Sequence, residues 1–338
     1  AAAAVLASCA TEEPPAPPPP PPPPPLALND AVAQAASIYV AFMHDARAIP
    51  AGGFTDAESI QAAIRKGAAY DPAQLSRGMI AYGAILALQS PEFVQGVRQY
   101  AVDADIRQEM VTRIVADPAT AATLPGAEAA AGLIVGTLGQ DVAAMLAIAD
   151  AVEQDAYTIQ ERNDPRRRWA ITPIADRTMR LEGAKALSAA EMLPSAEEAA
   201  RLFAAAHAGE GLTATPAATG APYTPAVTRS LALAALAALG AGGEEGRANT
   251  EALSIDQNSE FCLNMSKLML FQCLAASRPS YEDMFCIGRH IARDLSTCTA
   301  QSITPAPAPV APTMVADTAA PVAPAVSSAA SATVGGAR

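Results

Sequence analysis

The sequence predicts an all-α protein: an irregular multi-helix bundle with a C-terminal disulfide-stapled helical hairpin and disordered, proline-rich ends. Three observations predict this class. Alanine-rich segments with apolar residues three and four positions apart recur along the chain, and this spacing is the helical period. The sequence lacks the runs that alternate β-branched or aromatic residues with polar ones, as strands do. Four of the five cysteines lie between Cys262 and Cys298.

The chain opens with residues that lead up to a cysteine in the order Leu6-Ala7-Ser8-Cys9, and every residue before Cys9 is small or apolar. This motif resembles the lipobox of bacterial lipoproteins. The resemblance implies that residues 1–8 are part of a signal peptide, that cleavage occurs before Cys9, and that Cys9 carries a diacylglycerol group and an acylated amino group. Two or three acyl chains anchor a protein stably. The alternative is an alanine-rich end with an unmodified thiol.

Residues 9–25 are expected to form the lipid anchor and a spacer. Pro17 to Pro25 is an unbroken proline run, and nine prolines in polyproline II at ~3.1 Å each make a semi-rigid rod of about 28 Å. We expect this rod to hold the body away from the bilayer. A proline-rich ligand for an aromatic-lined groove is the alternative. Ala10 follows the cysteine where inner-membrane lipoproteins of this family carry aspartate, so the resemblance implies the outer membrane, facing the periplasm.

Composition narrows the classes of partner. The chain has 338 residues, a formal net charge of −12 and a pI near 4.7. We therefore expect no nucleic-acid partner, because neutralising phosphates requires a basic surface. We expect no apolar run long enough for a membrane-spanning helix, because Leu231–Leu239 is short, and Glu128, Gln140 and Asp141 interrupt the stretch around Leu133. We expect a soluble body large enough for one large helical domain or two smaller ones.

The first helical domain is expected over residues 26–212. Asp71-Pro72 and Ser90-Pro91 each place a capping side chain before a proline at the first helical position. Apolar stripes follow both caps, at Leu75, Met79, Tyr82 and Leu86, and then at Phe93, Val97 and Tyr100. Further helix starts are expected near Asn29, Thr55, Pro125, Ser195 and Thr224.

The rest of the chain divides at glycine and proline. Residues 213–224 lie in a stretch with several glycines and prolines and are expected to form a loop or hinge. Residues 225–302 are expected to form a second helical part that contains the four-cysteine hairpin. Residues 303–338 are rich in Pro, Ala, Ser and Thr, and such a tail buries too little apolar surface to order itself.

The four cysteines of the second helical part are expected to form two disulfides, as an oxidising compartment favours. Pro279 interrupts the helical pattern, and Ser280 with Asp283 has capping-box spacing, so an antiparallel hairpin is expected to turn here. Cysteines at similar distances from the turn lie opposite each other on the two helices. This pairs Cys273 with Cys286 and Cys262 with Cys298. Cys262 and Cys273 lie ~16 Å apart along one helix, too far to be bridged.

This arrangement resembles, in architecture only, the doubly stapled hairpin of twin-cysteine mitochondrial proteins. Cys286 and Cys298 are twelve residues apart, about 120° out of phase on an ideal helix, so we expect the second helix to loosen near Ser296-Thr297. Free or metal-binding thiols are the alternative, but none has C-x-x-C spacing.

The first helix of the hairpin is apolar nearly all round, and we expect it to be largely buried in the core. The alternative is a methionine-rich groove for a partner, since flexible thioethers adapt to varied surfaces. The residues concerned are Phe261, Leu263, Met265, Leu268, Met269, Leu270, Phe271 and Leu274.

The sequence contains few signals of chemistry. His44, His207 and His290 lie in no metal-ligand spacing, and we expect neither a metal nor a cofactor. Arg166, Arg167, Arg168 and Trp169 form one dense basic cluster, which could hold an anionic partner by charge and stacking. Acidic residues beside the cluster favour a self-neutralised surface corner instead.

One enzymatic alternative rests on Glu58-Ser59 in an expected helix. This pair resembles the Glu-Ser pair of lytic transglycosylases, which are all-helical and often lipoproteins. The resemblance implies that Glu58 acts as general acid and base on peptidoglycan, with a pKa raised by burial. The family's downstream Gly-Leu-Met-Gln stretch is missing here, and Glu58 is also an ordinary first-turn acid.

The sequence therefore predicts a non-catalytic, lipid-anchored module of the bacterial envelope with a structural or interaction role. Its expected partners are the membrane, through the lipid on Cys9, and either an envelope protein or peptidoglycan. A lytic transglycosylase-like enzyme using Glu58 and a small-ligand binding module remain as alternatives. The enzyme requires Glu58 in a cleft, the binding module requires a closed apolar pocket, and the interaction module requires an exposed apolar patch.

Overall fold

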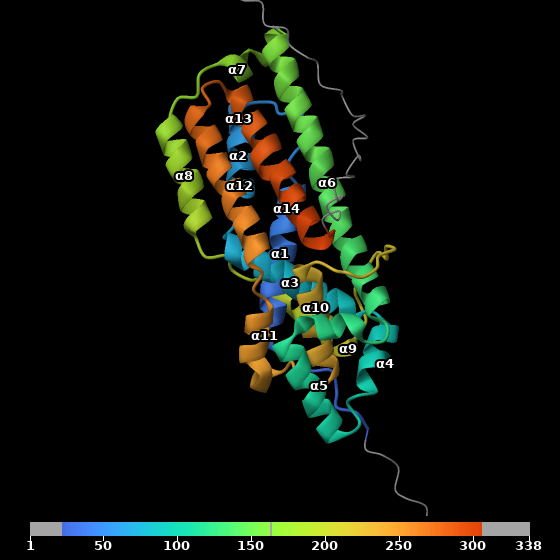
Figure 1. The fold of residues 1–338 in the computed structure, drawn as a ribbon. Helices are drawn as coiled ribbons and strands as arrows, with labels where there is room; N and C mark the ends of the chain where they lie inside the picture. Colours follow the sequence, from blue (N-terminus) through green and yellow to red (C-terminus); the bar gives the residue numbers. More distant parts are fainter. Residues whose placement is uncertain (1–21, 163, 306–338) are drawn as a thin grey trace, which may run out of the picture. The chain divides into compact units, whose positions relative to one another are not determined.

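A computed structural model of the chain describes residues 22–162 and 164–305 (Figure 1). Cys9, the rest of residues 1–21, and the tail from residue 306 lie outside the described residues. Within the described ranges the chain is helical, and its only β-type pairings are two isolated bridges, Leu28–Gly242 and Pro173–Pro279. The all-α prediction is confirmed.

The described part of the chain contains fourteen α-helices. The first seven are α1 Asp30–Arg47, α2 Ala57–Ala68, α3 Pro72–Leu88, α4 Pro91–Arg98, α5 Ala104–Ala116, α6 Ala127–Glu161 and α7 Arg168–Ile171. The others are α8 Arg177–Ala189, α9 Ala196–Ala208, α10 Pro225–Ala238, α11 Arg247–Leu253, α12 Gln257–Ala276, α13 Ser280–Ile287 and α14 Asp294–Ile303. Short 3₁₀ turns cover Pro118–Thr123, Pro165–Arg167 and Glu244–Gly246, and a π-helical turn covers Gly288–Arg293.

Local capping signals set the helix starts. The side chains of Asp71, Ser90, Ser195 and Thr224 each accept a hydrogen bond from the backbone N–H three residues on, as the sequence predicts. Asn29 caps α1 in the same way. The other two starts are shifted slightly, because Asp56 and not Thr55 caps α2, and Gly126 precedes α6.

The core is built on α1, α3 and α10, which pack through small residues. A Cβ atom on Gly78 of α3 would lie 2.5 Å from the carbonyl oxygen of Ala35 in α1, so only glycine allows this close approach of the two backbones. Ser230 of α10 donates to the carbonyl of Ile80 at 3.0 Å. Of the predicted stripes, Leu75, Met79, Leu86, Phe93 and Val97 are buried, while Tyr82 and Tyr100 are half-buried and pack against the core.

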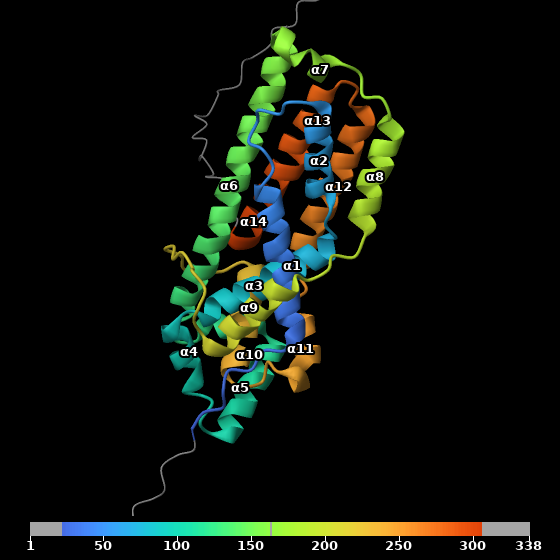
Figure 2. The same ribbon diagram turned by 180° about the vertical axis from the view of Figure 1, so that it is seen from behind.

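The last prolines of the run lie against the body. The guanidinium of Arg98 in α4 donates to the carbonyl of Pro24 at 2.9 Å. Just after this point Leu28 is buried, and the backbone N–H of Asn29 donates to the carbonyl of Gly242 at 2.9 Å. The chain therefore meets the body beside α4 and the end of α10, far from α12 and α13 in both views (Figures 1 and 2).

The longest helix, α6, corrects one expectation. Glu128, Gln140 and Asp141 do not interrupt it, and by length and composition alone it qualifies as a membrane-spanning helix. It packs against α13, α14 and the π turn, and 39% of its most apolar window is buried. Asp141, itself buried, accepts hydrogen bonds from Tyr39 and Arg47 at 3.2 and 2.9 Å.

The loop between α9 and α10 is confirmed as non-helical, and it lies along α6. The N–H of Ala217 donates to the carbonyl of Gly132 at 3.0 Å, and the N–H of Thr215 donates to the hydroxyl of Thr137 at 3.0 Å. These contacts hold residues 213–224 on the body.

Candidate interaction surface on the stapled hairpin

The hairpin consists of α12 and of the continuous run α13, π turn and α14. Its disulfides join Cys262 to Cys298 and Cys273 to Cys286, with Cα–Cα distances of 5.6 and 5.7 Å. Both pairings are those predicted from heights along two antiparallel helices. The hairpin stands between α8 on one side and α6 on the other (Figures 1 and 2).

The second helix of the hairpin changes its winding, but not where the sequence suggested. The predicted loosening near Ser296-Thr297 is wrong, because those residues lie within the regular helix α14. The π turn at Gly288–Arg293 takes its place. A π turn holds one residue more than an α turn, so it absorbs the twelfth residue between Cys286 and Cys298 and brings both sulfurs to the face of α12.

The turn of the hairpin also differs from its prediction. Asp283 does not cap α13, which has no side-chain cap. Instead its fully buried carboxylate accepts hydrogen bonds from Arg180 of α8 at 2.6 and 2.7 Å, and from the hydroxyl of Ser277 at 2.6 Å. The carboxylate of Asp283 binds the guanidinium that α8 supplies and does not cap the backbone of its own helix, because a cap that faces solvent would give it no cation.

A second arginine of α8 holds the end of α12. The guanidinium of Arg177 donates to the carbonyls of Ser277 and Ala275, both at 2.7 Å. These carbonyls lack helical partners at a C-terminus, where the helix dipole also favours a cation. The buried ion pair thus joins α8 to α13, and the cap by Arg177 joins α8 to the end of α12.

The side of α12 that faces the body carries a buried lysine. The ammonium of Lys267 donates to the carbonyls of Ala68 and Ser188 at 3.2 Å each, and lies 4.1 Å from the ring centroid of Tyr70. It also contacts the carbonyl of Tyr70 and the hydroxyl of Ser188. Burial lowers the pKa of Lys267 to about 7. This amine ties α12 to the C-terminal ends of α2 and α8.

The opposite side of α12 is exposed and apolar. Leu263, Leu270 and Leu274 are buried, but the prediction that the whole helix is largely buried is wrong. Neighbouring helices cover only one of its faces. The exposed side chains, here called the α12 stripe, are Phe261, Met265, Leu268 and Met269, with 66%, 37%, 46% and 38% of their surface accessible.

The exposed side of α12 carries no charge after Glu260, and its polar members are Asn264 and Gln272. From Phe261 to Ala276 the helix contains one charged residue, Lys267, and that side chain is buried. The chain as a whole carries a net charge of −12. Depletion of charge together with enrichment of Phe and Met is the compositional signal of the centre of a protein interface.

The enzymatic candidate lies elsewhere, on the surface. The side chain of Glu58, in the first turn of α2, is 75% exposed and pairs at 2.6 Å with Arg65 in the last turn. This setting does not provide the burial that would make a glutamic acid a proton donor near neutral pH.

The basic cluster is partly neutralised, as the sequence suggested. Arg166 pairs with Asp164 at 3.3 Å, and Arg167 pairs with Asp155 of α6. Trp169 packs against the core, while Arg168 is exposed. The four side chains therefore do not form one face with several exposed cations beside an exposed aromatic ring.

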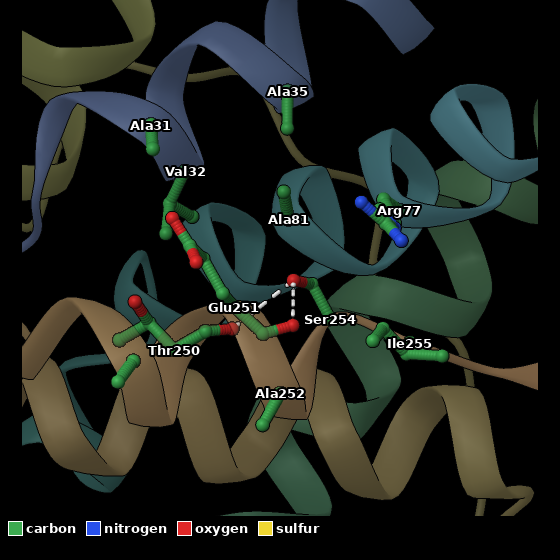
Figure 3. Close-up of a pocket in the computed structure, with 11 residues that line it drawn as sticks. Ala31, Val32, Ala35, Arg77, Ala81, Thr250, Glu251, Ala252, Ser254 and Ile255 are labelled. Atoms are coloured by element: carbon green, nitrogen blue, oxygen red, sulfur yellow. Dashed lines mark hydrogen bonds between the residues drawn. The ribbon is translucent and has the colours of Figure 1, made fainter.

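Two cavities of the described body have room for a small ligand. One of about 590 Å³ lies between α1, α3 and α11, with Arg77 and Glu251 among its polar side chains (Figure 3). Another of about 650 Å³ lies where Pro24 meets Arg107 and Gly240. Both are open to solvent and mixed in polarity, whereas a small-ligand module calls for a closed apolar pocket.

No protein-family model, curated protein or solved structure matches the chain. The assignment of a site therefore depends on the geometry above. Sequence reasoning missed the bracing contacts of Arg180 and Lys267, which join residues 103 and 79 positions apart. One signal was present, because Lys267 is the one charged residue between Phe261 and Ala276.

Proposed function

We propose that this protein is a lipid-anchored, non-catalytic interaction module of the bacterial envelope, and that the α12 stripe binds its partner protein. The observation that carries the proposal is an exposed, uncharged, largely apolar helix face on an element that is braced from its other side. Two disulfides, the cap by Arg177 and the amine of Lys267 all hold α12.

Rigid bracing suits a binding surface, because a helix that is already ordered loses little conformational entropy on association. The four stripe residues are spaced by four, three and one positions along about 12 Å of helix. This narrow ridge matches the apolar face of a partner helix, which would insert its own side chains between Phe261, Met265 and Leu268.

The proposed occupant is an apolar helix of a different envelope protein. The exposed parts of the four side chains amount to about 350–400 Å², taking roughly 200 Å² for each. Pairing the stripes of two copies would bury about 750 Å² in total, less than the ~1,200 Å² of stable specific interfaces. A larger partner that extends over neighbouring helices meets that requirement.

The position of the anchor supports this use. Cys9 is proposed to carry the lipid, and Arg98 holds the last prolines at the end of the body where α4 lies. The α12 stripe lies on the hairpin, away from that end (Figures 1 and 2). A body tethered at Cys9 would thus present α12 away from its own membrane, towards periplasmic partners.

The test uses the full-length protein in its own cells, with a photoreactive benzoylphenylalanine in place of Met265. We expect an adduct with another envelope protein whose cross-linked peptide lies on an apolar helix. The matched control places the same group at Met179 of α8, which is 73% exposed, and we expect no such adduct there.

The same binding is then measured with the purified partner. Leu268→Asp should weaken it by about tenfold or more, as for loss of a central apolar contact, while Met179→Asp leaves it unchanged. An adduct formed only between two copies of the chain, equal adducts at positions 265 and 179, or no effect of Leu268→Asp would refute the proposal.

A further inference from the structure

A second surface feature lies between α6 and α13 and shares no residue with the α12 stripe. Tyr157 of α6 and Phe285 of α13 make an edge-to-face contact, with ring centroids 5.8 Å apart and ring planes inclined at 65°. With Tyr281, Glu282 and Gln160 they line a surface pocket of about 220 Å³, here called the aromatic pocket. The pocket gathers three aromatic rings in a chain whose residues are only 4% aromatic.

The rings of the aromatic pocket stand on ordered helices. Tyr281 and Phe285 are four residues apart on α13 and therefore lie on the same face of that helix. Cys286, next to Phe285, is joined to α12 by its disulfide. Ala156, which also lines the pocket, is buried, whereas Tyr157 is 46% exposed. The rings are thus held in place before a ligand binds, and part of their surface is accessible to it.

The electrostatics of the aromatic pocket favour a cation. The faces of aromatic rings carry partial negative charge, and a cation within about 6 Å of a ring centroid is attracted to it. Glu282 is the one charged residue among the described residues that line the pocket. Its carboxylate accepts a hydrogen bond from the backbone N–H of Arg278 at 2.7 Å, and this neutral donor does not cancel its charge. An anionic ligand would therefore be repelled.

The groups that line the aromatic pocket distinguish a quaternary ammonium from a primary one. A primary ammonium carries N–H donors that require acceptors, and it is strongly hydrated. A quaternary ammonium has no N–H group, so contact with aromatic rings leaves no donor without a partner. Aromatic cages of this kind bind choline and methylated lysine. The volume of the pocket is below the roughly 300–1,000 Å³ of sites for drug-sized ligands, so it suits a single head group.

We propose that the aromatic pocket is a binding site for a quaternary ammonium group, which is held by the three rings and by the charge of Glu282. Free molecules such as choline and the phosphocholine head groups of lipids share this trimethylammonium group. The site depends neither on the α12 stripe nor on a lipid at Cys9, so it stands or falls separately from the proposed function.

The test titrates the full-length protein with choline and follows the trimethyl signal of the ligand by saturation-transfer NMR. We expect a dissociation constant of about 1 mM, since a small cation contacts only a few rings. The control ligand is the neutral carbon analogue of choline, in which a tert-butyl group replaces the trimethylammonium group. It has the same shape without the charge and should bind at least about tenfold more weakly. This comparison requires no variant of the protein.

Variants then locate the binding in the aromatic pocket. Tyr157→Leu and Phe285→Leu each remove a ring but keep an apolar side chain, and each should weaken choline binding by about fivefold or more. Glu282→Gln should weaken it by about twofold to fivefold through the lost charge. Tyr223→Leu is the matched control, because Tyr223 lies on the loop before α10, outside the pocket, and it should leave binding unchanged.

The proposal is overturned if the neutral analogue binds as tightly as choline, if lysine amide binds more tightly, or if neither ring replacement weakens binding. Absence of choline binding up to about 50 mM also overturns it.

Where choline binds, vesicles identify the source of the group, with Cys9→Ser protein so that no lipid anchor inserts. Retention on phosphatidylcholine vesicles but not on phosphatidylglycerol vesicles supports a lipid head group. Retention that does not depend on the head group, or no retention, supports a free ligand.

Discussion

Replacing Lys267 by methionine should change how the stability of the protein depends on pH. The ammonium of Lys267 is buried, and it has only carbonyl and hydroxyl oxygens and the ring of Tyr70 as partners. Burial lowers its pKa from 10.5 to about 7. In the unfolded chain the same lysine is exposed and titrates near its ordinary value.

The sign of the effect follows from proton uptake. Between pH 7 and 10.5 the unfolded chain holds a proton on Lys267 that the folded chain has largely lost, so the free energy of unfolding rises with pH. The slope approaches ~1.4 kcal/mol per pH unit. Between pH 7 and 9.5 the rise amounts to about 3 kcal/mol. Below pH 7 both states hold the proton, and this contribution to the slope disappears.

The assay is urea unfolding followed by far-UV circular dichroism from pH 7 to 9.5, on chains that also carry Cys9→Ser so that no thiol can exchange with the disulfides. Subtracting the curve of Lys267→Met from that of the parent removes the titration of all other groups. Lys185→Met is the matched control, because Lys185 is exposed and pairs only with Glu182.

The expected difference between parent and Lys267→Met grows by about 3 kcal/mol in favour of the parent over this pH range, while Lys185→Met parallels the parent. A parent whose stability relative to Lys267→Met is constant or falls with rising pH would refute the reasoning. Such a result would mean that the carbonyls of the two helix ends hold the proton on Lys267 more strongly than burial removes it.

Three further predictions concern packing. Arg180→Met should lower the free energy of unfolding by ~3–5 kcal/mol, because the carboxylate of Asp283 stays buried without its cation. Urea unfolding at pH 7 measures this loss, and a loss below 1 kcal/mol would contradict the prediction. Replacing both cysteines of Cys273–Cys286 by alanine should lower the free energy of unfolding by about 3 kcal/mol, and the same change at Cys262–Cys298 should lower it by about 4 kcal/mol. The second loss is larger because that disulfide closes a longer loop and so removes more entropy from the unfolded chain. The reverse order in calorimetry would rule out this account. Gly78→Ala should cost ~1–3 kcal/mol by pushing α3 away from the backbone of α1, and an unchanged melting temperature would show that the two helices separate without strain.

Much of the fold could be predicted because its causes are local. A side chain that accepts from the N–H three residues later acts over one turn, so Asp71, Ser90 and Thr224 could be recognised as helix starts without a partner. The disulfide pairing was predictable for a related reason. Each residue of a helix adds a fixed rise, so the number of residues from Pro279 gives a cysteine's distance from the turn. Only one pairing joins cysteines that lie at about the same distance from the turn on the two helices.

The candidate sites were less predictable, because exposure is a property of neighbours. Phe261 and Leu263 are alike in their sequence setting, yet one faces solvent and the other the core, and only the placement of α3, α8 and α14 decides which. Tyr157 and Phe285 are far apart in the chain, yet their rings make an edge-to-face contact with centroids 5.8 Å apart. No residue near either of them in the sequence indicates that the two rings are in contact.

The sequence by itself determined the helical class, the caps, the two disulfide pairs and the expectation of a lipid anchor at Cys9, since each depends on residues close together or on simple helical arithmetic. Only the tertiary structure decided that Asp283 pairs with Arg180, that the π turn rather than Ser296-Thr297 absorbs the extra residue, and that one face of α12 stays uncovered. The physical reason is that burial, desolvation and packing depend on which elements meet, and that choice is made by the whole chain together.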